Sequence, residues 1–483
     1  MTEANDGGAA TLDGLDDLLG RWASGRGPLY LLLAARLRDL IDDGVLAPGT
    51  LLPPDRALAR RLAVARGTVV AAYDLLQQEG RVVRRQGSGT RVAASGGAVP
   101  PKDVIPNPLL MHILHPPDGV RLLTCAAPVE PPPVLAEAYH HAARTLAATG
   151  HDLGYQPAGH PALREAVAAA YRRRGLPTSA EEIMVTTGAQ QALTLLTALL
   201  AGPGDTVLTE SPTYPGALEV FRHAAAVVRP VDTDPLLPDL AAALRERPAL
   251  LYVVPTASNP GGSVMDVATR RRIAELAAAH DVPVIDDEVC AELCFSGEVP
   301  PPLAAYDPRA ITIASLSKVV WGGLRLGWIR ASAPLVARLA RLRAIHDLGG
   351  EVASQLAAAW LLDRMEEVRR DRTDTLRARH DHLCAELRAH LPEWEFREAL
   401  GGQTLWVRLP RGDADSFAQV ALRHGVAVAP GRSFDPLGGH ADHLRLHFLF
   451  TPEELSSCVR GLAAAWAAYD GSTARAASHA LIV

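Results

Sequence analysis

The feature that most constrains the fold is an alternation of apolar runs and Ala-rich segments through the middle of the chain. The apolar runs have the length and composition of buried strands, and AQQALTLLTALL and RRRIAELAAAH have the length of helices. Strands that alternate with helices favour a largely parallel sheet. The sequence therefore predicts an α/β domain whose ligands bind at the carboxyl ends of the strands. The expected strands lie in EIMVTTG, DTVLTE, ALLYVVP, VPVIDDEV and AITIASL.

Composition limits the classes of protein that this chain can belong to. With 483 residues, 48% apolar content and a net charge of -6, the chain is long enough for two or three domains with buried cores. No run of about 18 apolar residues is present, and the first residues are acidic where a secretory signal would be basic. We therefore expect a cytoplasmic protein with no membrane partner. The five cysteines lack CxxC or Cys/His spacing, so neither a disulfide framework nor a metal site is expected.

Local composition predicts two domains, a linker and two loose ends. Residues 1–26 are Gly/Asp-rich, and residues 94–118 mix Gly, Pro and short apolar runs without a sustained period. The predicted parts are a flexible arm at 1–26, a small domain at 27–93, a linker at 94–118, a large domain at 119–468 and a tail at 469–483.

The small domain has the pattern of three helices followed by a hairpin. One helix is expected from Pro28 to a stop at Gly44, and two short ones at about 55–62 and 66–79, joined by a tight connection. That spacing is typical of a helix-turn-helix. RVVRRQGSGTRV then predicts two strands around a GSG turn, which would form a wing. The expected shared core is Leu58, Leu62, Val70, Tyr73 and Leu76.

Positive charge is concentrated in this block. Residues 54 to 91 hold eight arginines and three acidic residues, a local charge of +5 in a chain that is acidic overall. A solvated basic face on an ordinary helical domain is the simpler explanation for such charge. The complete order of helices and basic wing instead favours double-stranded DNA as a partner. The candidate DNA-binding residues near the second helix and in the wing are Arg56, Arg66, Thr68, Arg84 and Arg85.

The block resembles the winged helix-turn-helix of the GntR family of transcription regulators. The resemblance lies in PLY, GVLAPGTLLPPDRALARRL, ARGTVVAAYDLLQQEG and GSGT. It implies that Arg56 and Arg66 are the chief DNA contacts and that the wing reaches the adjacent groove. Pro54 and Ala65 stand where small polar residues are usual in the family, which removes two hydroxyl contacts and leaves more of the affinity to arginine.

In the large domain, polar residues follow successive predicted strands. A strand-to-helix junction at Gly188, Ala189 and Gln190 leaves backbone N–H groups free to hold an anion. Alone, each of these features has an ordinary structural explanation, such as a turn former or a surface charge. The other residues at strand ends are Tyr214, Asn259, Asp286, Asp287, Ser315, Lys318 and Arg325.

Lysine is rare in this chain, which makes its position informative. Of 48 basic residues only Lys102, in the predicted linker, and Lys318, after a predicted strand, are lysines. A primary amine condenses with an aldehyde to form a Schiff base, and a guanidinium group cannot. Together with an aromatic plate, a buried acid and an anion-holding helix start, Lys318 suits a planar, phosphate-bearing aromatic aldehyde.

From about residue 120 to 468 the chain resembles the fold-type I pyridoxal-phosphate aminotransferases. Joined to the winged helix, it is identified as a member of the MocR-type regulators of the GntR superfamily. The resemblance implies that pyridoxal 5'-phosphate is the cofactor, that Lys318 bonds to its aldehyde and that Asp287 pairs with the pyridinium nitrogen. Asn259 would then bond to the ring's 3-oxygen, and Tyr214 would stack on its face.

The same resemblance implies the phosphate and substrate contacts. The phosphate would be held by Gly188, Ala189, Gln190, Ser315 and Arg325, and by Tyr155 from a partner subunit. PGRSFDP followed by HLRLHF makes Arg445 the residue that receives a substrate carboxylate. One departure is Cys290, which stands where these aminotransferases usually have tyrosine. The adjacent Asp286 is the alternative to Asp287 as the pyridinium partner.

Three functions remain open at this point. The first is a transcription regulator in which an amino acid or amine effector reacts with the cofactor at Lys318 and alters DNA binding. The second is an active aminotransferase that carries a DNA-binding module, and steady conversion of an amino donor and a keto acceptor would favour it. The third is a DNA-binding protein whose enzyme-like domain only dimerises. A homodimer is expected because this fold builds its pocket at a subunit interface and paired winged helices read paired half-sites.

Overall fold

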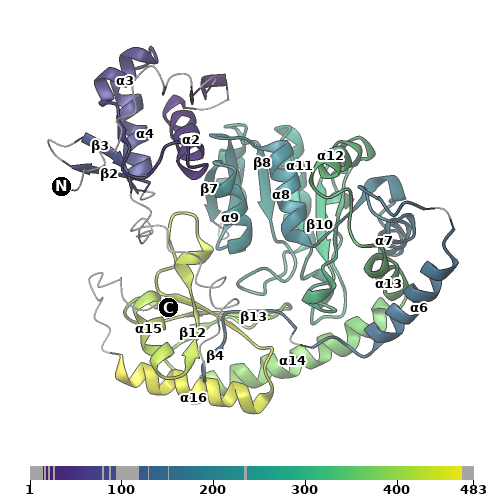
Figure 1. Cartoon of the computed structure of the whole chain (residues 1–483). Coiled ribbons are helices and arrows are strands. Elements are labelled where there is room, and N and C mark those ends of the chain that lie inside the picture. The colour runs from purple at the N-terminus through teal and green to yellow at the C-terminus, as the bar shows by residue number, and fades with distance from the viewer. Residues whose placement is uncertain are drawn as a thin grey trace, which may run out of the picture. The chain divides into compact units, whose positions relative to one another are not determined.

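The computed structural model divides into two compact units, an N-terminal unit that contains η1 to β3 and a larger unit that contains β4 to α16 (Figure 1). The expected linker, nearly all of the tail and most of the arm lie outside the described residues. Within the described ranges, no helix is both long and apolar enough to cross a membrane. The structure describes residues 15, 18–19, 22–24, 28–78, 81–85, 89–93, 119–128, 130–150, 152–232 and 236–469.

The N-terminal unit contains the predicted helix-turn-helix and wing. Its antiparallel sheet has the strand order β1-β3-β2, and β1 was not predicted. Leu51 and Leu52 form this strand by pairing with the outer side of the wing, at Arg91 and Thr90. The elements are η1 (Trp22–Ser24), α2 (Leu29–Asp42), β1 (Leu51–Leu52), α3 (Asp55–Arg61), α4 (Arg66–Gln78), β2 (Val82–Arg85) and β3 (Gly89–Val92).

The core of this unit differs from the prediction in two places. Leu58, Tyr73 and Leu76 are fully buried as predicted, but Val69 is buried where Val70 was expected, and Leu62 is only half-buried. The helical period of 3.6 residues predicts which residues are buried only to within one position. The packing of α4 decides that Val69, and not the adjacent Val70, is buried. The Tyr73 hydroxyl donates a hydrogen bond of 2.9 Å to the Pro53 carbonyl.

The expected loose arm contributes to this core in its described part. Leu15 and Leu19 are both 1% exposed and belong to the same apolar cluster as Leu33 and Leu37 of α2. Arg36 of α2 donates a hydrogen bond of 2.8 Å to the Leu18 carbonyl. The prediction of a loose arm is therefore wrong for these residues, because leucines at helical spacing bury their side chains even in a polar, Gly/Asp-rich context.

A seven-stranded sheet of order β5-β11-β10-β9-β8-β6-β7 organises the larger unit. Strands β6, β8, β9 and β10 are parallel, and β11 runs antiparallel between β10 and β5. All residues of β5, β8, β9 and β10 are buried, as expected for strands covered on both faces. The strands are β5 (Ile183–Thr186), β6 (Thr206–Ser211), β7 (Val227–Asp232), β8 (Leu250–Val253), β9 (Val284–Asp287), β10 (Ile311–Ser315) and β11 (Gly327–Arg330).

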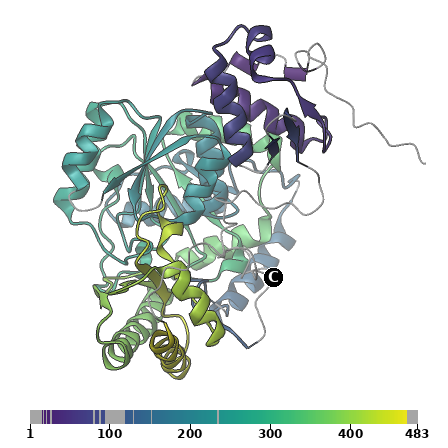
Figure 2. The same ribbon diagram turned by 90° about the vertical axis from the view of Figure 1, so that its left-hand side faces the viewer.

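Helices flank this sheet on both sides (Figure 2). The connections from strand to helix place helix starts at the carboxyl ends of the strands, as a parallel sheet requires. The helices of this part are α6 (Val134–Ala148), α7 (Pro161–Arg173), α8 (Ala189–Leu200), α9 (Pro215–His223), α10 (Leu236–Leu244), α11 (Val267–Ala279), α12 (Ala333–His346) and α13 (Val352–Leu362). Short 3-10 turns are η2 (Ala180–Glu182), η3 (Ala291–Leu293), η4 (Leu303–Ala305) and η5 (Gly322–Leu324).

The rest of the larger unit forms a smaller α/β layer. Its sheet has the order β12-β13-β16-β15, and β14 pairs in parallel with β4 from the start of the unit. The long helix α14 lies beside α16 (Figure 1). The elements are β4 (Arg121–Leu122), α14 (Met365–His390), β12 (Glu395–Phe396), β13 (Thr404–Arg408), α15 (Ala414–Arg423), β14 (Val426–Ala427), β15 (Ala429–Pro430), η6 (Gly431–Phe434), β16 (His443–His447) and α16 (Pro452–Ala468).

Candidate functional site

Lys318 lies where the carboxyl ends of β9 and β10 meet. Its Nζ donates a hydrogen bond of 2.5 Å to the carbonyl of Ala126, and the side chain is half-buried. Removal from water lowers the pKa of Lys318, and the nearby carboxylate of Asp287 acts against that shift. A lowered pKa makes the neutral amine, which is the nucleophilic form, easier to reach.

Asp287, the last residue of β9, presents a buried carboxylate to the same site. Its Oδ2 accepts a hydrogen bond of 2.6 Å from the Tyr252 hydroxyl, and its Oδ1 accepts one of 2.9 Å from the Val289 amide. Burial raises the pKa of Asp287 to about 6, and the two hydrogen bonds and the charge of Lys318 limit the rise. The carboxylate is therefore held negative near neutral pH in a fixed orientation.

Asp286, the alternative carboxylate, lies on the opposite face of the strand, since successive residues of a strand alternate. Its Oδ2 accepts a hydrogen bond of 2.7 Å from the Leu303 amide. Burial and the neighbouring charge of Glu288 raise the pKa of Asp286 far above its ordinary value. The geometry favours Asp287 as the acid that works with Lys318.

An anion-binding corner forms around the start of α8. Gly188 precedes the helix with φ of +118°, and a Cβ at this position would lie 3.2 Å from Nη2 of Arg325. Arg325 also donates a hydrogen bond of 2.7 Å from Nη2 to the Thr187 carbonyl. The exposed guanidinium of Arg325 thus lies beside the start of α8, where the first-turn amides of Ala189 and Gln190 are found, and this combination would suit a phosphate group.

Ser315 is connected to this corner through β11. Gly327 pairs with Ser315 on one side and with Thr186 on the other, and a Cβ on Gly327 would lie 2.9 Å from the Gly188 Cα. The Ser315 hydroxyl donates a hydrogen bond of 2.8 Å to the Leu326 carbonyl and lies 2.6 Å from the Ser317 hydroxyl. The lack of a side chain at Gly327 allows this close approach.

Tyr214 is half-buried and held in place by the first turn of α8. Its hydroxyl donates a hydrogen bond of 3.2 Å to Oε1 of Gln190, whose Nε2 donates one of 2.8 Å to the Gly216 carbonyl. Burial, together with the charge of Asp287, raises the pKa of Tyr214 to about 12. The phenol therefore stays neutral, and its ring is fixed beside the charged groups of the site.

Arg445 of β16 supplies a buried guanidinium whose hydrogen-bond partners among the described residues are an amide and a carbonyl, not an acid. Its Nη1 donates a hydrogen bond of 3.2 Å to Oδ1 of Asn259, and its Nη2 donates to the Thr124 carbonyl. The Nε is buried with no hydrogen-bond partner. Burial lowers the pKa of Arg445 to about 10, so the group remains a cation. A ligand carboxylate would satisfy a buried cation of this kind.

Tyr155 is 66% exposed, and among the described residues it makes no hydrogen bond or ring contact with the other site residues of its own chain. Sequence reasoning also missed two participants. The Tyr252 hydroxyl donates a hydrogen bond to Asp287. The sequence indicates this residue only as the single hydroxyl-bearing residue in the apolar run ALLYVVP. Residues 124–126 supply carbonyls to Arg445 and Lys318, and nothing in their sequence indicates this.

In the N-terminal unit, Arg56 and Arg66 are both exposed where α3 and α4 begin. The carboxylate of Asp55 accepts a hydrogen bond of 2.9 Å from the backbone amide of Arg56 and forms an ion pair of 2.9 Å with Nη2 of Arg66. Thr68 is half-buried in the first turn of α4. Arg66 thus lies at the start of the second helix, the part that contacts bases in a helix-turn-helix, and its guanidinium is paired with Asp55.

Arg84 in the wing contacts residues of its own unit. Its guanidinium forms an ion pair with Asp74 and lies 5.6 Å from the centre of the Tyr73 ring, both on α4. Its Nε also donates a hydrogen bond of 3.3 Å to the Thr90 hydroxyl. Arg84, a predicted DNA contact, therefore binds other residues of its own unit in this structure. The side chain of Arg85 lies outside the described residues.

Comparison with known proteins defines the class of this chain. Residues 122–462 match the family "Aminotransferase class I and II", and residues 29–92 match "Bacterial regulatory proteins, gntR family". The crystal structure of LysN, an alpha-aminoadipate aminotransferase from Thermus thermophilus, is 28% identical with a TM-score of 0.66, and the match covers 74% of this chain and 94% of that one. That protein was crystallised with N-(5'-phosphopyridoxyl)-L-leucine. The larger unit thus has the fold-type I aminotransferase fold.

Relatives that match almost the whole chain are regulators. The HTH-type transcriptional regulator YisV of Bacillus subtilis is 31% identical over 88% of this chain and 92% of its own length. TauR of Rhodobacter capsulatus, also an HTH-type transcriptional regulator, is 30% identical over 89% of this chain and 96% of its own length. The chain belongs to the aminotransferase class I and II family and, with its gntR-type domain, is a MocR-type transcriptional regulator of the GntR superfamily.

Glu210 at the end of β6 provides a test of the electrostatics around these strand ends. It is buried and accepts a hydrogen bond of 2.6 Å from the Val254 amide, and burial raises its pKa to about 7. The folded chain therefore keeps a proton that the unfolded chain has already lost, so the parent loses stability as the pH rises through the folded pKa. Glu210→Gln keeps the acceptor and removes this titration.

We expect the difference in thermal midpoint, variant minus parent, to grow in favour of Glu210→Gln between about pH 5.5 and about pH 8. Differential scanning fluorimetry of both proteins across that range measures it. Glu219→Gln, at an exposed position on α9, serves as the matched control and should give a constant difference. A constant difference for Glu210→Gln would contradict the raised pKa.

Proposed function

We propose that this chain is a pyridoxal-phosphate-dependent regulator in which an amino acid or amine effector reacts at Lys318 and alters DNA binding. The observation that carries the proposal is the pairing of a half-buried lysine, whose pKa is lowered, with a buried carboxylate at adjacent strand ends. A ligand carboxylate would supply the partner that the Nε of Arg445 lacks, and the cofactor phosphate would bind at the Gly188 corner.

The residues present fit pyridoxal phosphate. When bound, this group supplies an aldehyde that condenses with primary amines and a ring that withdraws electrons. Asp287 would hold the proton on the pyridinium nitrogen, and Tyr214 would cover one face of the ring. Asn259 would donate its amide to the 3-oxygen. The phosphate would be bound by the α8 amides, Ser315 and Arg325, with Tyr155 of a partner subunit adding a further contact.

Arg445 would select the effector. Its guanidinium is 5% exposed and has no competing acid among the residues described, so an effector carboxylate would meet a desolvated cation. The ring of Phe434 lies 4.9 Å from its Cζ and limits its movement. Amino acids and other carboxylated amines are therefore the expected class, and the affinity for amines without a carboxylate should be lower.

The proposed output is a change in DNA binding by the N-terminal unit. Arg56, Arg66 and Thr68 would contact double-stranded DNA, with Arg85 and Arg84 of the wing adding to the positive field. An effector changes DNA binding only if it favours one arrangement of the two units. A homodimer in the cytoplasm is part of the proposal, because the exposed Tyr155 needs a second chain to contribute to a site.

An active aminotransferase is the second candidate, favoured by the coexistence of Lys318, Asp287 and Arg445 in one site. Cys290 stands against it. The thiol lies near Lys318, and burial raises its pKa to about 11, so it stays protonated and donates only weak hydrogen bonds. The regulator is the better supported function, since the relatives that span both units are regulators.

Lys318→Ala tests the proposal directly. The variant cannot bond covalently to the cofactor, so we expect loss of the absorbance band of the lysine-bonded cofactor, loss of any effector response and retention of basal DNA binding. Lys102→Ala changes the other lysine of the chain and is the matched control, which should remain yellow. Absorbance spectra and DNA-binding assays of the three proteins measure this. An absorbance spectrum of Lys318→Ala unchanged from that of the parent would overturn the assignment.

Arg66→Ala tests the DNA-binding surface. Each arginine that contacts a phosphate adds about 0.9 to the salt slope of binding, so the slope should fall by about one and the affinity should drop at low salt. Fluorescence anisotropy with a short mixed-sequence duplex at several salt concentrations measures both. Arg272→Ala, which removes an exposed ion-paired arginine from α11, should leave them unchanged. Equal slopes for Arg66→Ala and the parent protein would exclude a phosphate contact.

Arg445→Gln tests the effector class. Loss of a charge-assisted pair should weaken the response to carboxylated amines by about tenfold or more, and should leave the response to amines without a carboxylate nearly unchanged. The change in cofactor absorbance with amine concentration measures it. Arg432→Gln, in an exposed ion pair with Asp415, is the control. Equal losses for both kinds of amine would mean that Arg445 supports the fold and does not select the effector.

A further inference from the structure

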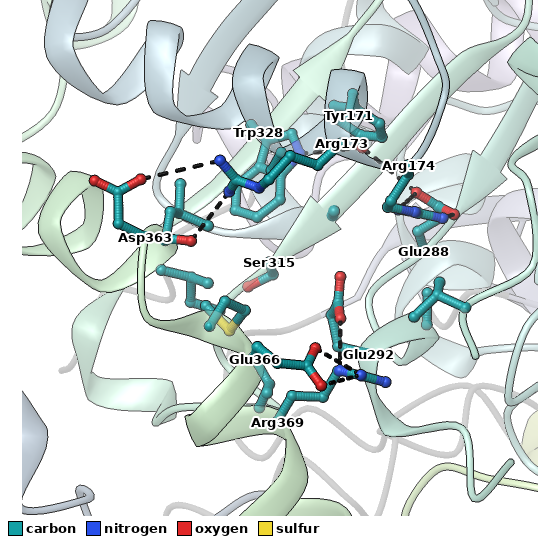
Figure 3. Close-up of a pocket in the computed structure, with 18 of the residues that line it drawn as sticks. Tyr171, Arg173, Arg174, Glu288, Glu292, Ser315, Trp328, Asp363, Glu366 and Arg369 are labelled. Atoms are coloured by element: carbon teal, nitrogen blue, oxygen red, sulfur yellow. Dashed lines mark hydrogen bonds and ion pairs between the residues drawn. The ribbon is translucent and has the colours of Figure 1, made fainter. Parts of the chain in front are cut away.

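A second cavity, of about 460 Å³, is lined by neither Lys318 nor Arg445 but borders the segment that carries Lys318. Figure 3 shows the residues that line it. Its walls come from α7, the end of α13, the start of α14, and the segments that follow β9 and β10. The volume is within the range of small-molecule sites. Of the residues assigned to the cofactor above, only Ser315 lines it, and nothing in the proposed function uses it.

One part of the wall is apolar and aromatic. Leu316, Val319 and Met365 line it together with Tyr171 and Trp328. The Trp328 Nε1 donates a hydrogen bond of 3.2 Å to the Tyr171 hydroxyl, so the aromatic pair is fixed. Such a wall accepts a hydrocarbon body, and the faces of aromatic rings also attract cations.

The charged part of the wall holds three arginines and four acidic residues, so one negative charge is in excess. The excess is not at Glu288, because Arg174 binds both of its oxygens at 2.6 and 3.1 Å. Asp363 is not the source either, since it is a mostly exposed residue at the rim, 4.0 Å from Arg173. Figure 3 shows these two pairs on one side of the cavity and the cluster around Arg369 on the other.

Glu292 carries the charge that is least compensated. Arg369 directs its Nη2 to Glu366, with contacts of 2.9 and 2.7 Å, and reaches Glu292 only through Nε at 3.8 Å. The side chain of Glu292 is 34% exposed, and its partial burial raises the pKa of Glu292 although the charges of Arg174 and Arg369 act against that shift. A ligand ammonium beside Glu292 would therefore satisfy a charge that the protein leaves poorly paired.

We propose that this cavity binds a small organic cation, whose ammonium group donates to Glu292 and whose hydrocarbon body packs against Trp328 and Met365. The inference does not rest on the cofactor or on the DNA-binding function. The cavity nevertheless shares a wall with the cofactor site, since Ser315, Leu316 and Val319 belong to the segment that carries Lys318. A ligand in the cavity contacts that segment from the side away from Asp287.

The probe for the test is N,N-dimethylbutylamine, a tertiary amine that is protonated at neutral pH. A tertiary amine cannot form a Schiff base, so its binding is separate from any reaction at Lys318. Isothermal titration calorimetry on the full chain, purified with pyridoxal phosphate, should detect saturable binding. Hexanol, an uncharged molecule of similar size, should bind at least about tenfold more weakly than the amine, because it lacks the charge-assisted hydrogen bond.

Two variants locate the binding. Glu292→Gln should weaken the amine by about tenfold, whereas Asp374→Asn, which removes one negative charge from an exposed position on α14, should not change it. Val299→Trp should abolish binding by filling the cavity from its loop side. Circular dichroism and cofactor absorbance confirm that each variant is folded.

Three results would overturn the proposal. The first is the absence of saturable amine binding to the folded parent. The second is equal affinity for the amine and for hexanol, which would mean that no carboxylate takes part. The third is binding that survives both Glu292→Gln and Val299→Trp, which would locate the amine elsewhere on the chain. Failure of the cofactor assignment, in contrast, would appear only with primary amines and in Lys318→Ala.

Discussion

The buried carboxylate of Asp287 is the group on which the rest of the large unit's chemistry depends. A carboxylate without water is costly, and here a phenol and a backbone amide offset that cost with hydrogen bonds of 2.6 and 2.9 Å. Because β9 and β10 are parallel neighbours, this charge lies beside the loop that carries Lys318. Burial lowers the pKa of the lysine and raises that of the acid, so both groups are shifted toward neutral pH.

The run Asp286, Asp287 and Glu288 shows how one strand end serves two environments. Alternation along the strand directs Asp287 to Lys318 and directs the other two acids to the opposite side, where Glu288 binds Arg174 and lines the second cavity. Three consecutive acids are thus not redundant. The same alternation explains why the cavity and the cofactor site share a wall without sharing their charges.

Sequence patterns were sufficient for the elements and insufficient for the contacts. Each predicted strand and helix named by its apolar period is present, and the polar strand ends of the large unit converge, because parallel strands finish at one edge. The patterns missed what depends on packing between elements: Val69 in place of Val70, the burial of Leu15 and Leu19, and the ion pair that draws Arg84 to Asp74. The bond from Tyr252 to Asp287 joins two strands, and only their register creates it.

The side chains of Cys290 and Tyr252 offer a physical reason why this site would suit a sensor of amino acids better than an aminotransferase. In the proposed function, the phenol that usually follows the pyridinium-binding acid is absent, and the phenol that the chain does supply bonds to the acid itself. Tyr252 therefore stabilises the negative charge of Asp287, while the neutral thiol of Cys290 donates little to the ring oxygen. Asn259 would be left as the main donor there, and its Oδ1 already accepts from Arg445. A ligand carboxylate that engages Arg445 would thereby also act on the amide that positions the ring, which couples effector binding to the cofactor without requiring turnover.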